Sequence, residues 1–171
     1  MPFNVNDFRA NLTYGGARNN KFEVQVTNPW INTADSKYPF LVKAASLPAL
    51  TAGTIEIPYM GRKIKLPGDP TYEEWVVTIF NDNDFAIRDS LIGWYKAIHP
   101  TVSNTNTFGG TSPALYKSQA LVRQLDLLDN VVKTVTFDGI FPSAVSSIEL
   151  GSEMNDQIEE FTVTFQYDWW E

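Results

Sequence analysis

The sequence predicts a mainly β protein, a sandwich or barrel of about seven to nine strands with one flanking α-helix. Three observations support this fold class. Apolar and polar residues alternate in many short segments, one segment shows the spacing of an amphipathic helix, and turn-favouring residues separate the segments. The 171 residues fit one domain, residues 1–171, which at this size buries roughly 70% of its unfolded surface without a metal or a disulfide.

The first part of the chain predicts two strands and two irregular segments. Asn4 to Asn20 is polar and contains glycine, so we expect a loop or short irregular structure that orders on a neighbour. Lys21 to Val26 alternates and predicts a half-buried strand. Thr27 to Pro39 is a connection whose aromatic residues favour local packing over a contact between subunits, and Phe40 to Ser46 is a second strand.

A hairpin is predicted at the centre of the chain. Thr54 to Tyr59 and Arg62 to Leu66 alternate, and Met60-Gly61 turns the chain between them. The Pro67-Gly68-Asp69-Pro70 run is the strongest turn signal in the sequence, because two fixed φ angles flank a glycine. A third strand then follows from Tyr72 to Phe80.

The hairpin is expected at a free edge or at a bulge, because Pro58 lacks the N–H that a central strand needs. It carries three basic residues beside apolar residues that an isolated subunit gains nothing by exposing. These candidate intersubunit residues are Ile55, Ile57, Tyr59, Arg62, Lys63, Ile64 and Lys65. We therefore expect Thr54 to Leu66 to project from its own subunit and pack on another.

One helix is predicted, from about Asp84 to His99, after capping residues and before Pro100. Its apolar residues recur at three- and four-residue spacing, which places one face against a sheet. They are Ile87, Leu91, Trp94, Tyr95 and Ile98. The outward residues are Arg88, Asp89 and Lys96. His99 is the only histidine, and its place at a helix end favours a stabilising role over a catalytic one.

The second half of the chain predicts further strands. Thr101 to Pro113 is polar and glycine-rich, hence a mobile loop. Tyr116 to Leu128 and Val131 to Asp138 are expected to form a hairpin that Pro142 closes. The last strand has the clearest alternation. Its apolar face holds Phe161, Val163, Phe165, Tyr167 and Trp169, and its polar face holds Glu160, Thr162, Thr164, Gln166 and Asp168, with no positive charge.

The charge distribution is one-sided. The net charge of -7 argues against ordinary nucleic-acid binding, which relies on lysine and arginine. Every charged residue from Thr134 to Glu171 is acidic, which fits a solvated surface or a basic partner. The chain starts without the pattern of a cleaved signal and has no apolar stretch of about 18 residues, so we expect no secretion signal and no membrane anchoring.

No catalytic constellation is evident, so we expect no enzyme, no cofactor and no metal. The chain has no cysteine and no HExxH, GxSxG or Walker-type motif. Neighbouring carboxylates such as Glu73-Glu74 point to opposite faces of a strand and cannot act as a dyad. A carbohydrate-binding or carbohydrate-active monomer, built from carboxylates and the five tryptophans, is the remote alternative.

Six blocks in order carry a resemblance to a known family. They are SLPA, IEIPYMGRKIKLPGD, TYEEWVVTIFND, YKSQALVRQ, FDGIFPSAV and FTVTFQYDWWE. From Phe22 to Glu171 the chain resembles the tail tube proteins of contractile-tailed bacteriophages. It departs from them at Thr27 to Pro39, which is longer than the short connection expected there.

The resemblance implies a structural protein of the virion tail, assembled in the host cytoplasm. Hexameric rings would stack head to tail, and sheets of neighbouring subunits would join into a β-barrel around a channel for the genome. The implied partners are further copies of the chain, the sheath protein, and baseplate and tail-terminator proteins, with DNA passing without specific binding. A tube-initiating or tube-terminating paralogue, or the tube of a related injection system that carries protein, stays open.

Within such a tube, the polar face of the last strand is expected to line the channel. Its candidate residues are Glu160, Thr162, Thr164, Gln166 and Asp168. A face without lysine or arginine gives passing phosphates nothing to bind. Arg88, Asp89 and Lys96 are expected to face the sheath.

Overall fold

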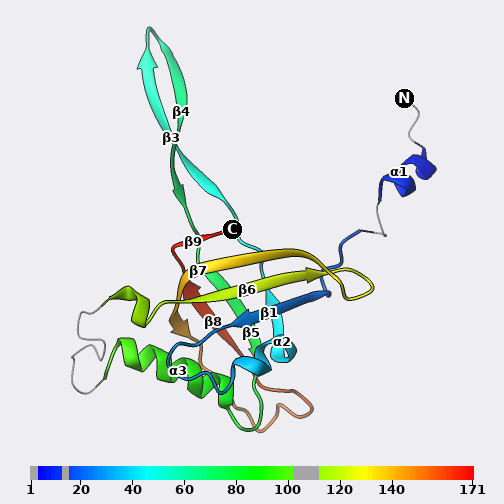
Figure 1. Ribbon diagram of the computed structural model, residues 1–171, viewed down its shortest axis with the longest axis vertical. Helices are drawn as coiled ribbons and strands as arrows, with labels where there is room; N and C mark the ends of the chain where they lie inside the picture. The colour runs from blue at the N-terminus through cyan, green and yellow to red at the C-terminus, as the bar shows by residue number, and fades with distance from the viewer. Residues whose placement is uncertain (1–3, 13–15, 102–111) are drawn as a thin grey trace.

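The computed structural model describes residues 4–12, 16–101 and 112–171, so most of the loop predicted from Thr101 to Pro113 lies outside the described residues. Its main layer is a seven-stranded antiparallel sheet, in the order β1-β6-β7-β8-β5-β2 with β9 paired to β7 (Figure 1). β3 and β4 form a separate two-stranded ribbon. The predicted mainly β fold is confirmed, and β1 and β2 are the two edges of the described sheet.

The strands are β1 (Phe22–Val26), β2 (Val42–Ala45), β3 (Thr51–Tyr59), β4 (Arg62–Thr71), β5 (Trp75–Phe80), β6 (Ser118–Leu125), β7 (Val131–Val145), β8 (Glu160–Gln166) and β9 (Trp169–Trp170). The helices are α1 (Val5–Asn11), α2 (Tyr38–Leu41) and α3 (Ala86–Ile98), with 3-10 turns η2 (Asp35–Lys37) and η3 (Pro113–Leu115). None of the described helices is long and apolar enough to cross a membrane.

Aromatic residues of β5, β7 and β8 form the centre of the core. The ring of Trp75 stacks on Phe137 at a centroid distance of 4.4 Å and lies 5.6 Å from Phe165. All three are buried, as are the other inward residues of β8. The Trp75 indole N–H donates to the carbonyl of Ser46 at 2.9 Å, so the one polar atom of this ring is satisfied.

The helix α3 lies along one end of the sheet and buries the face that the spacing predicts (Figure 1). Leu91 and Trp94 are fully buried, and the Trp94 indole donates to the carbonyl of Tyr116 at 2.8 Å. Tyr95 was expected to be buried, but 38% of it is exposed, because it lies at the margin of the buried stripe and packs on His99.

Two of the predicted turns are wrong. Pro67 to Pro70 continues β4, because the ribbon has only two strands and its outer side requires no N–H donor. A register shift opposite Gly53 brings the backbones together: a Cβ on Gly68 would lie 3.0 Å from the carbonyl carbon of Gly53. Pro142 likewise does not close its unit, since β7 passes through it at a second register shift.

β7 is therefore longer than predicted and joins two parts of the sheet. Ser118 to Leu125 of β6 pair with it up to Ile140, and β8 pairs with it from Phe141 onward. Gly139, between these pairings, has φ +70°, a conformation that side chains rarely adopt. A Cβ there would lie 2.1 Å from a carboxylate oxygen of Asp168, so this bend requires glycine.

Three smaller expectations are corrected. Asn4 to Asn20 contains the helix α1, whose first turn is capped by the Asn4 side chain. Phe40 belongs to α2, which has Pro39 in its first turn, so β2 begins only at Val42. Trp169 is 51% exposed, because the chain leaves the line of β8 at Asp168 and β9 pairs with β7 instead.

The connection from Thr27 to Pro39 packs locally through Tyr38 and a buried polar network, whereas Trp30 is 49% exposed, so the expected local packing holds for one of its two large aromatic residues. The Asn28 amide donates to the carbonyl and to the hydroxyl of Ser90 on α3, at 3.0 and 2.7 Å. Its oxygen accepts from the backbone N–H groups of Trp30 and Ile31, and the Ser90 hydroxyl donates to the Ile31 carbonyl. Asn28 and Ser90 are both buried, so this network fixes the connection on the helix.

We predict that Asn28→Ala lowers the free energy of unfolding by on the order of 1–3 kcal/mol, because it leaves buried donors and acceptors unpaired. Urea unfolding followed by circular dichroism measures this change. Asn32→Ala is the matched control, since Asn32 lies in the same connection with an exposed side chain. Equal stabilities of the two variants would show that the network does not hold the connection.

Candidate functional site

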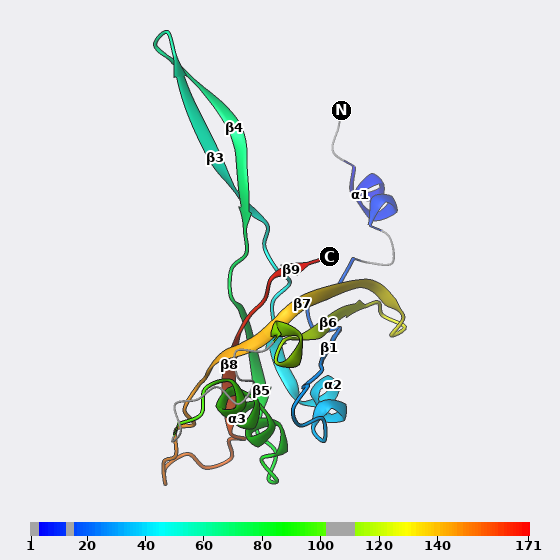
Figure 2. The same ribbon diagram turned by 60° about the vertical axis from the view of Figure 1, so that its left-hand side comes forward.

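The ribbon β3–β4 projects far from the sheet along the long axis of the molecule (Figures 1 and 2). Every residue of β3 is exposed, and every residue of β4 except Gly68, which is partly exposed. The predicted projection of Thr54 to Leu66 is therefore seen, and the packing of this hairpin on another copy stays a prediction.

The pairing register separates the hairpin residues into two faces. Residues directly opposite each other in an antiparallel pair share a face. Ile55 pairs with Leu66, Ile57 with Ile64, and Tyr59 with Arg62, so one face is an apolar stripe that ends in an arginine. The stripe consists of Ile55, Ile57, Tyr59, Ile64 and Leu66, all of which are exposed.

The other face of the hairpin carries the charges. Glu56 lies opposite Lys65, and Pro58 lies opposite Lys63. The Glu56 carboxylate accepts from the Lys63 ammonium at 2.7 Å and lies 3.9 Å from that of Lys65. Arg62, Lys63 and Lys65 are therefore not one cluster: the two lysines share an internal partner, and Arg62 lies on the apolar face.

The polar face of β8 is half exposed at Thr162, Thr164 and Gln166. Lys43 of β2 forms an ion pair with Glu160, and Lys117 contacts both carboxylate oxygens of Asp168 at 2.6 Å. The expectation of a face without positive charge is therefore corrected, since other segments bring two lysines to its ends. Both pairs lie within one chain and are partly exposed, so the lumen assignment stays a prediction.

Two of the three outward helix residues lie as predicted. Asp89 and Lys96 are exposed. Arg88 is only partly exposed: its guanidinium donates to the carbonyl of Ser146 at 3.0 Å and lies 5.3 Å from the ring centroid of Phe161. This arginine therefore holds the chain after β7 against the helix, and it is removed from the set expected to face outward.

Several groups with shifted pKa values lie in or beside the Thr27 to Pro39 connection. Hydrogen bonds from Lys37 lower the pKa of the Asp82 and Asp84 carboxyls, while burial raises the pKa of Asp35 and of the Tyr38 hydroxyl. Among the described residues, no group of three or more histidine, aspartate or glutamate side chains is placed to hold a metal. These shifts accompany packing of the connection and do not gather around a catalytic cleft.

Sequence reasoning missed several exposed apolar residues at the extremities of the molecule. One set consists of Val5 and Phe8 on α1 and Leu12 at its C-cap; this helix stands apart from the sheet and buries no residue (Figure 2). A second set, Leu127, Leu128, Val131 and Val132, lies at the tip of the β6–β7 hairpin. The helical spacing of the first set and the paired apolar residues of the second were visible in the sequence.

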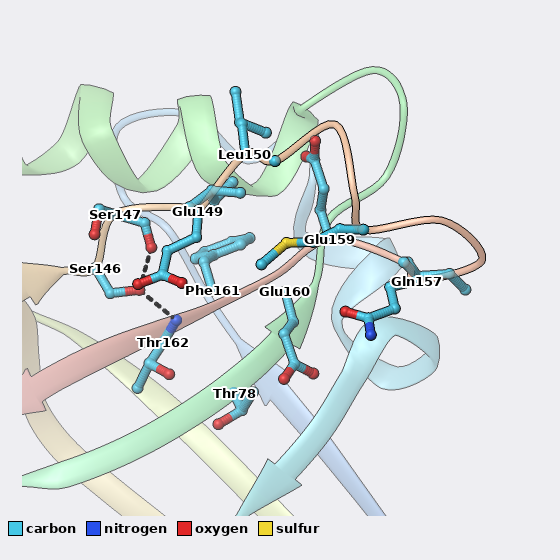
Figure 3. Close-up of a pocket in the computed structure, with 14 residues that line it drawn as sticks. Thr78, Ser146, Ser147, Glu149, Leu150, Gln157, Glu159, Glu160, Phe161 and Thr162 are labelled. Carbon is cyan, nitrogen blue, oxygen red and sulfur yellow. Dashed lines mark hydrogen bonds between the residues drawn. The ribbon is translucent and has the colours of Figure 1, made fainter.

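A third set follows β7. Leu150, Met154 and Ile158 are exposed on the loop that connects β7 to β8. This loop lies at the end of the molecule away from the hairpin tip (Figures 1 and 2). With its neighbours it encloses a pocket of about 490 Å³ at the start of β8 (Figure 3).

Unpaired sheet edges and exposed apolar residues at opposite ends define a class of protein: a structural subunit built to assemble with other subunits. Exposed edges and large apolar patches otherwise favour aggregation, so such a subunit covers them in its assembly. Sequence comparison agrees with this class. Residues 6–171 match the family model described as phage tail tube protein.

The chain therefore belongs to the phage tail tube protein family. It is 33% identical over 156 residues to the tail tube protein gp19 of Enterobacteria phage T4, which covers 91% of each chain. It is 28% identical over 168 residues to the tail tube protein of Serratia phage KSP90, with 95% of this chain and 93% of that protein covered. The recognition made from the sequence is confirmed, and the chain is homologous to the inner tube subunits of contractile tails, which are structural components of the virion.

Solved structures share the fold. A chain of the sheath/tube terminator of the extracellular contractile injection system PVC superposes with a TM-score of 0.66 at 16% identity, with coverage of 89% of this chain and 92% of that one. A chain of the PVC sheath-tube complex gives 0.63 at 15% identity and 95% coverage of both chains. A chain of the anti-feeding prophage baseplate gives 0.64 at 14% identity, with 91% and 93% covered.

We predict that replacing Thr51–Thr71 by a short Gly-Ser turn leaves the rest of the subunit folded. The ribbon contributes no buried residue, so the free energy of unfolding should change by about 0.5 kcal/mol or less. Urea unfolding and near-ultraviolet circular dichroism of the shortened chain measure this. Loss of a cooperative transition would contradict the separation of ribbon and core.

Proposed function

We propose that this chain forms hexameric rings that stack head to tail into the inner tube of a contractile phage tail, each subunit contributing the single domain 1–171. The tube conducts the genome during ejection. The observation that carries the proposal is the hairpin: a ribbon with an exposed apolar stripe that reaches beyond the body of its own subunit. Membership of the tail tube family supports it.

Ring closure provides the physical reason for the open sheet. β1 and β2 each have one unpaired edge, and exposed backbone N–H and C=O groups favour pairing with another strand. When identical subunits form a closed ring, every such edge lies beside a neighbour. Joined in this way, the sheets form a continuous β-barrel around the channel.

The polar face of β8 lines the channel in this arrangement. Its candidates are Glu160, Thr162, Thr164 and Gln166 of β8, together with Asp168 just beyond the end of the strand. The lysines nearby do not act as free cations for DNA, because Lys43 is paired with Glu160 and Lys117 with Asp168. Phosphates that find no unpaired cation gain little affinity, and a polyanion then passes with little friction.

The outer surface and the two ends of the tube have other partners. Asp89 and Lys96 on α3 face the sheath protein, and baseplate and terminator proteins meet the ends of the tube. The tube-initiating or tube-terminating paralogue and the injection-system tube with a protein cargo share this fold. The structural family favours a protein without enzymatic activity or cofactor.

We predict that the purified protein forms six-membered rings or tubes in negative-stain electron microscopy. The variant in which Arg62, Lys63 and Lys65 are all replaced by glutamate should remain folded but no longer form tubes, because six charge units per subunit change on the stacking hairpin. Circular dichroism checks the fold, and Lys96→Glu on α3 is the control that leaves stacking intact. A compact monomer at all concentrations would instead support the carbohydrate-binding class.

Labelling of single cysteines with maleimides tests which side of the sheet faces the channel. The chain has no cysteine, so Thr164→Cys and Lys96→Cys each introduce a single thiol. In tubes we expect a small maleimide to label both thiols, while a maleimide on a bulky polymer labels only position 96. Free subunits, in which both positions are at least partly exposed, should react at both with either reagent. Polymer labelling at position 164 along intact tubes would contradict the lumen assignment.

A further inference from the structure

The tip of the hairpin contains an apolar residue in a conformation that suits glycine. Met60 has φ 44°, Gly61 has φ 79°, and Met60 is 88% exposed. Tight hairpin turns with two positive φ angles favour asparagine, aspartate or glycine. A methionine at this position adds strain and buries nothing in its own subunit, which indicates that it serves a contact elsewhere.

Arg62, close to Met60 in the hairpin, is free to pair with a carboxylate of another subunit. Lys63 and Lys65 are both near the Glu56 carboxylate, whereas Arg62 lies on the opposite face and has no ion pair among the described residues. The tip therefore offers one flexible apolar side chain and one guanidinium. Methionine adapts to irregular apolar surfaces, and arginine binds carboxylates in a bidentate geometry.

A pocket with the complementary chemistry lies at the opposite end of the chain. Leu150 and Met154 of the β7–β8 loop line a pocket whose other residues are mostly polar. Figure 3 shows Leu150 on this loop and the buried Phe161 at the start of β8. The volume of about 490 Å³ is sufficient for more than one side chain. Leu150 is 80% exposed and Met154 48% exposed, so these two apolar side chains lack a cover within the subunit.

Three carboxylates border this pocket, and one of them can pair with a cation from another subunit. Glu160 is paired with Lys43, and Glu159 accepts from the Asn81 amide at 2.9 Å. Glu149 is exposed and has no ion pair among the described residues. No lysine or arginine follows Lys133 in the sequence, so a cation for Glu149 comes more readily from another copy.

We infer that the pocket beneath the β7–β8 loop is the acceptor for the hairpin tip of a copy in the next ring. Met60 packs on the exposed side chains of Leu150 and Met154 at the mouth of the pocket, and Arg62 pairs with Glu149. The tip and the pocket lie at opposite ends of the long axis, as a contact that repeats head to tail requires (Figures 1 and 2). The inference rests on the proposed stacking of rings and adds the site that receives the tip.

Disulfide cross-linking tests the apolar part of this contact. In a chain without native cysteines, Met60→Cys combined with Met154→Cys should give a ladder of covalent multimers when assembled tubes are oxidised. A disulfide requires Cα atoms within about 4.4–6.8 Å, so a ladder locates the contact closely. The control pair Met60→Cys with Leu128→Cys, at the β6–β7 tip, should give none.

Charge reversal tests the polar part and does not depend on cysteine chemistry. Arg62→Glu and Glu149→Arg should each raise the critical concentration for tube formation by about two- to fivefold, and the combined variant should restore it. Glu153→Arg, on the same loop but outside the pocket lining, is the control that should leave it near the original value. Circular dichroism confirms that each variant is folded.

The outcomes separate this inference from the proposed function. Tubes that form normally but give no ladder, with no recovery in the combined charge variant, would overturn the acceptor site and leave the tube proposal standing. A covalent dimer formed by Met60→Cys alone would also overturn it, because tips would then meet tips. Failure of the unmodified chain to form rings or tubes would instead overturn the proposed function.

Discussion

The whole sheet depends on the bend in β7. One continuous strand pairs with β6 along its first part and with β8 along its second, and β9 pairs beside it. Gly139 permits the change of direction, and the carboxylate of Asp168 occupies the space that a side chain would need. Lys117, the residue before β6, then binds that carboxylate. Without this bend, the β1–β6 half and the β8–β5–β2 half would be two separate surfaces.

The bend also decides what the chain presents to neighbours. In the sheet that it joins, β1 and β2 are open edges, and the β7–β8 loop and the β3–β4 ribbon lie at opposite ends of the molecule (Figure 1). In a monomer these features would be liabilities, because unpaired edges and uncovered apolar residues promote unspecific association. In a closed and stacked assembly each of them meets a defined surface of an identical subunit.

Local alternation was sufficient to predict much of this structure. Apolar residues at every second position predicted β8 and the hairpin strands, and apolar residues three or four positions apart predicted the buried stripe of α3. These spacings show which side of a strand or helix is apolar. Because side chains alternate along a strand, Arg62 points to one face of the hairpin and Lys63 and Lys65 point to the other. Their proximity in the sequence had suggested one cluster. Local packing was favoured for both Trp30 and Tyr38, yet only Tyr38 is buried.

Other features depend on contacts that the sequence does not reveal. Pro67 to Pro70 and Pro142 lie within strands because bulges and partner strands accommodate them, and a single segment gives no information about its partner. The lysines beside Glu160 and Asp168 come from β2 and from the residue before β6, so they depend on the order of strands in the sheet. The role of Arg88 requires the position of the β7–β8 loop.

The glycine bulge in the ribbon has a mechanical consequence. Gly53 and Gly68 bring the two backbones into close contact at the level where the strand register shifts, and no side chain braces the ribbon there. The two strands of the ribbon are already nearly extended, so their covalent backbones resist stretching along its length, whereas a glycine-containing bulge lets the ribbon bend. Rings connected through such ribbons can tilt against one another while remaining attached, so a long tube of these subunits would be inextensible and still pliable under load.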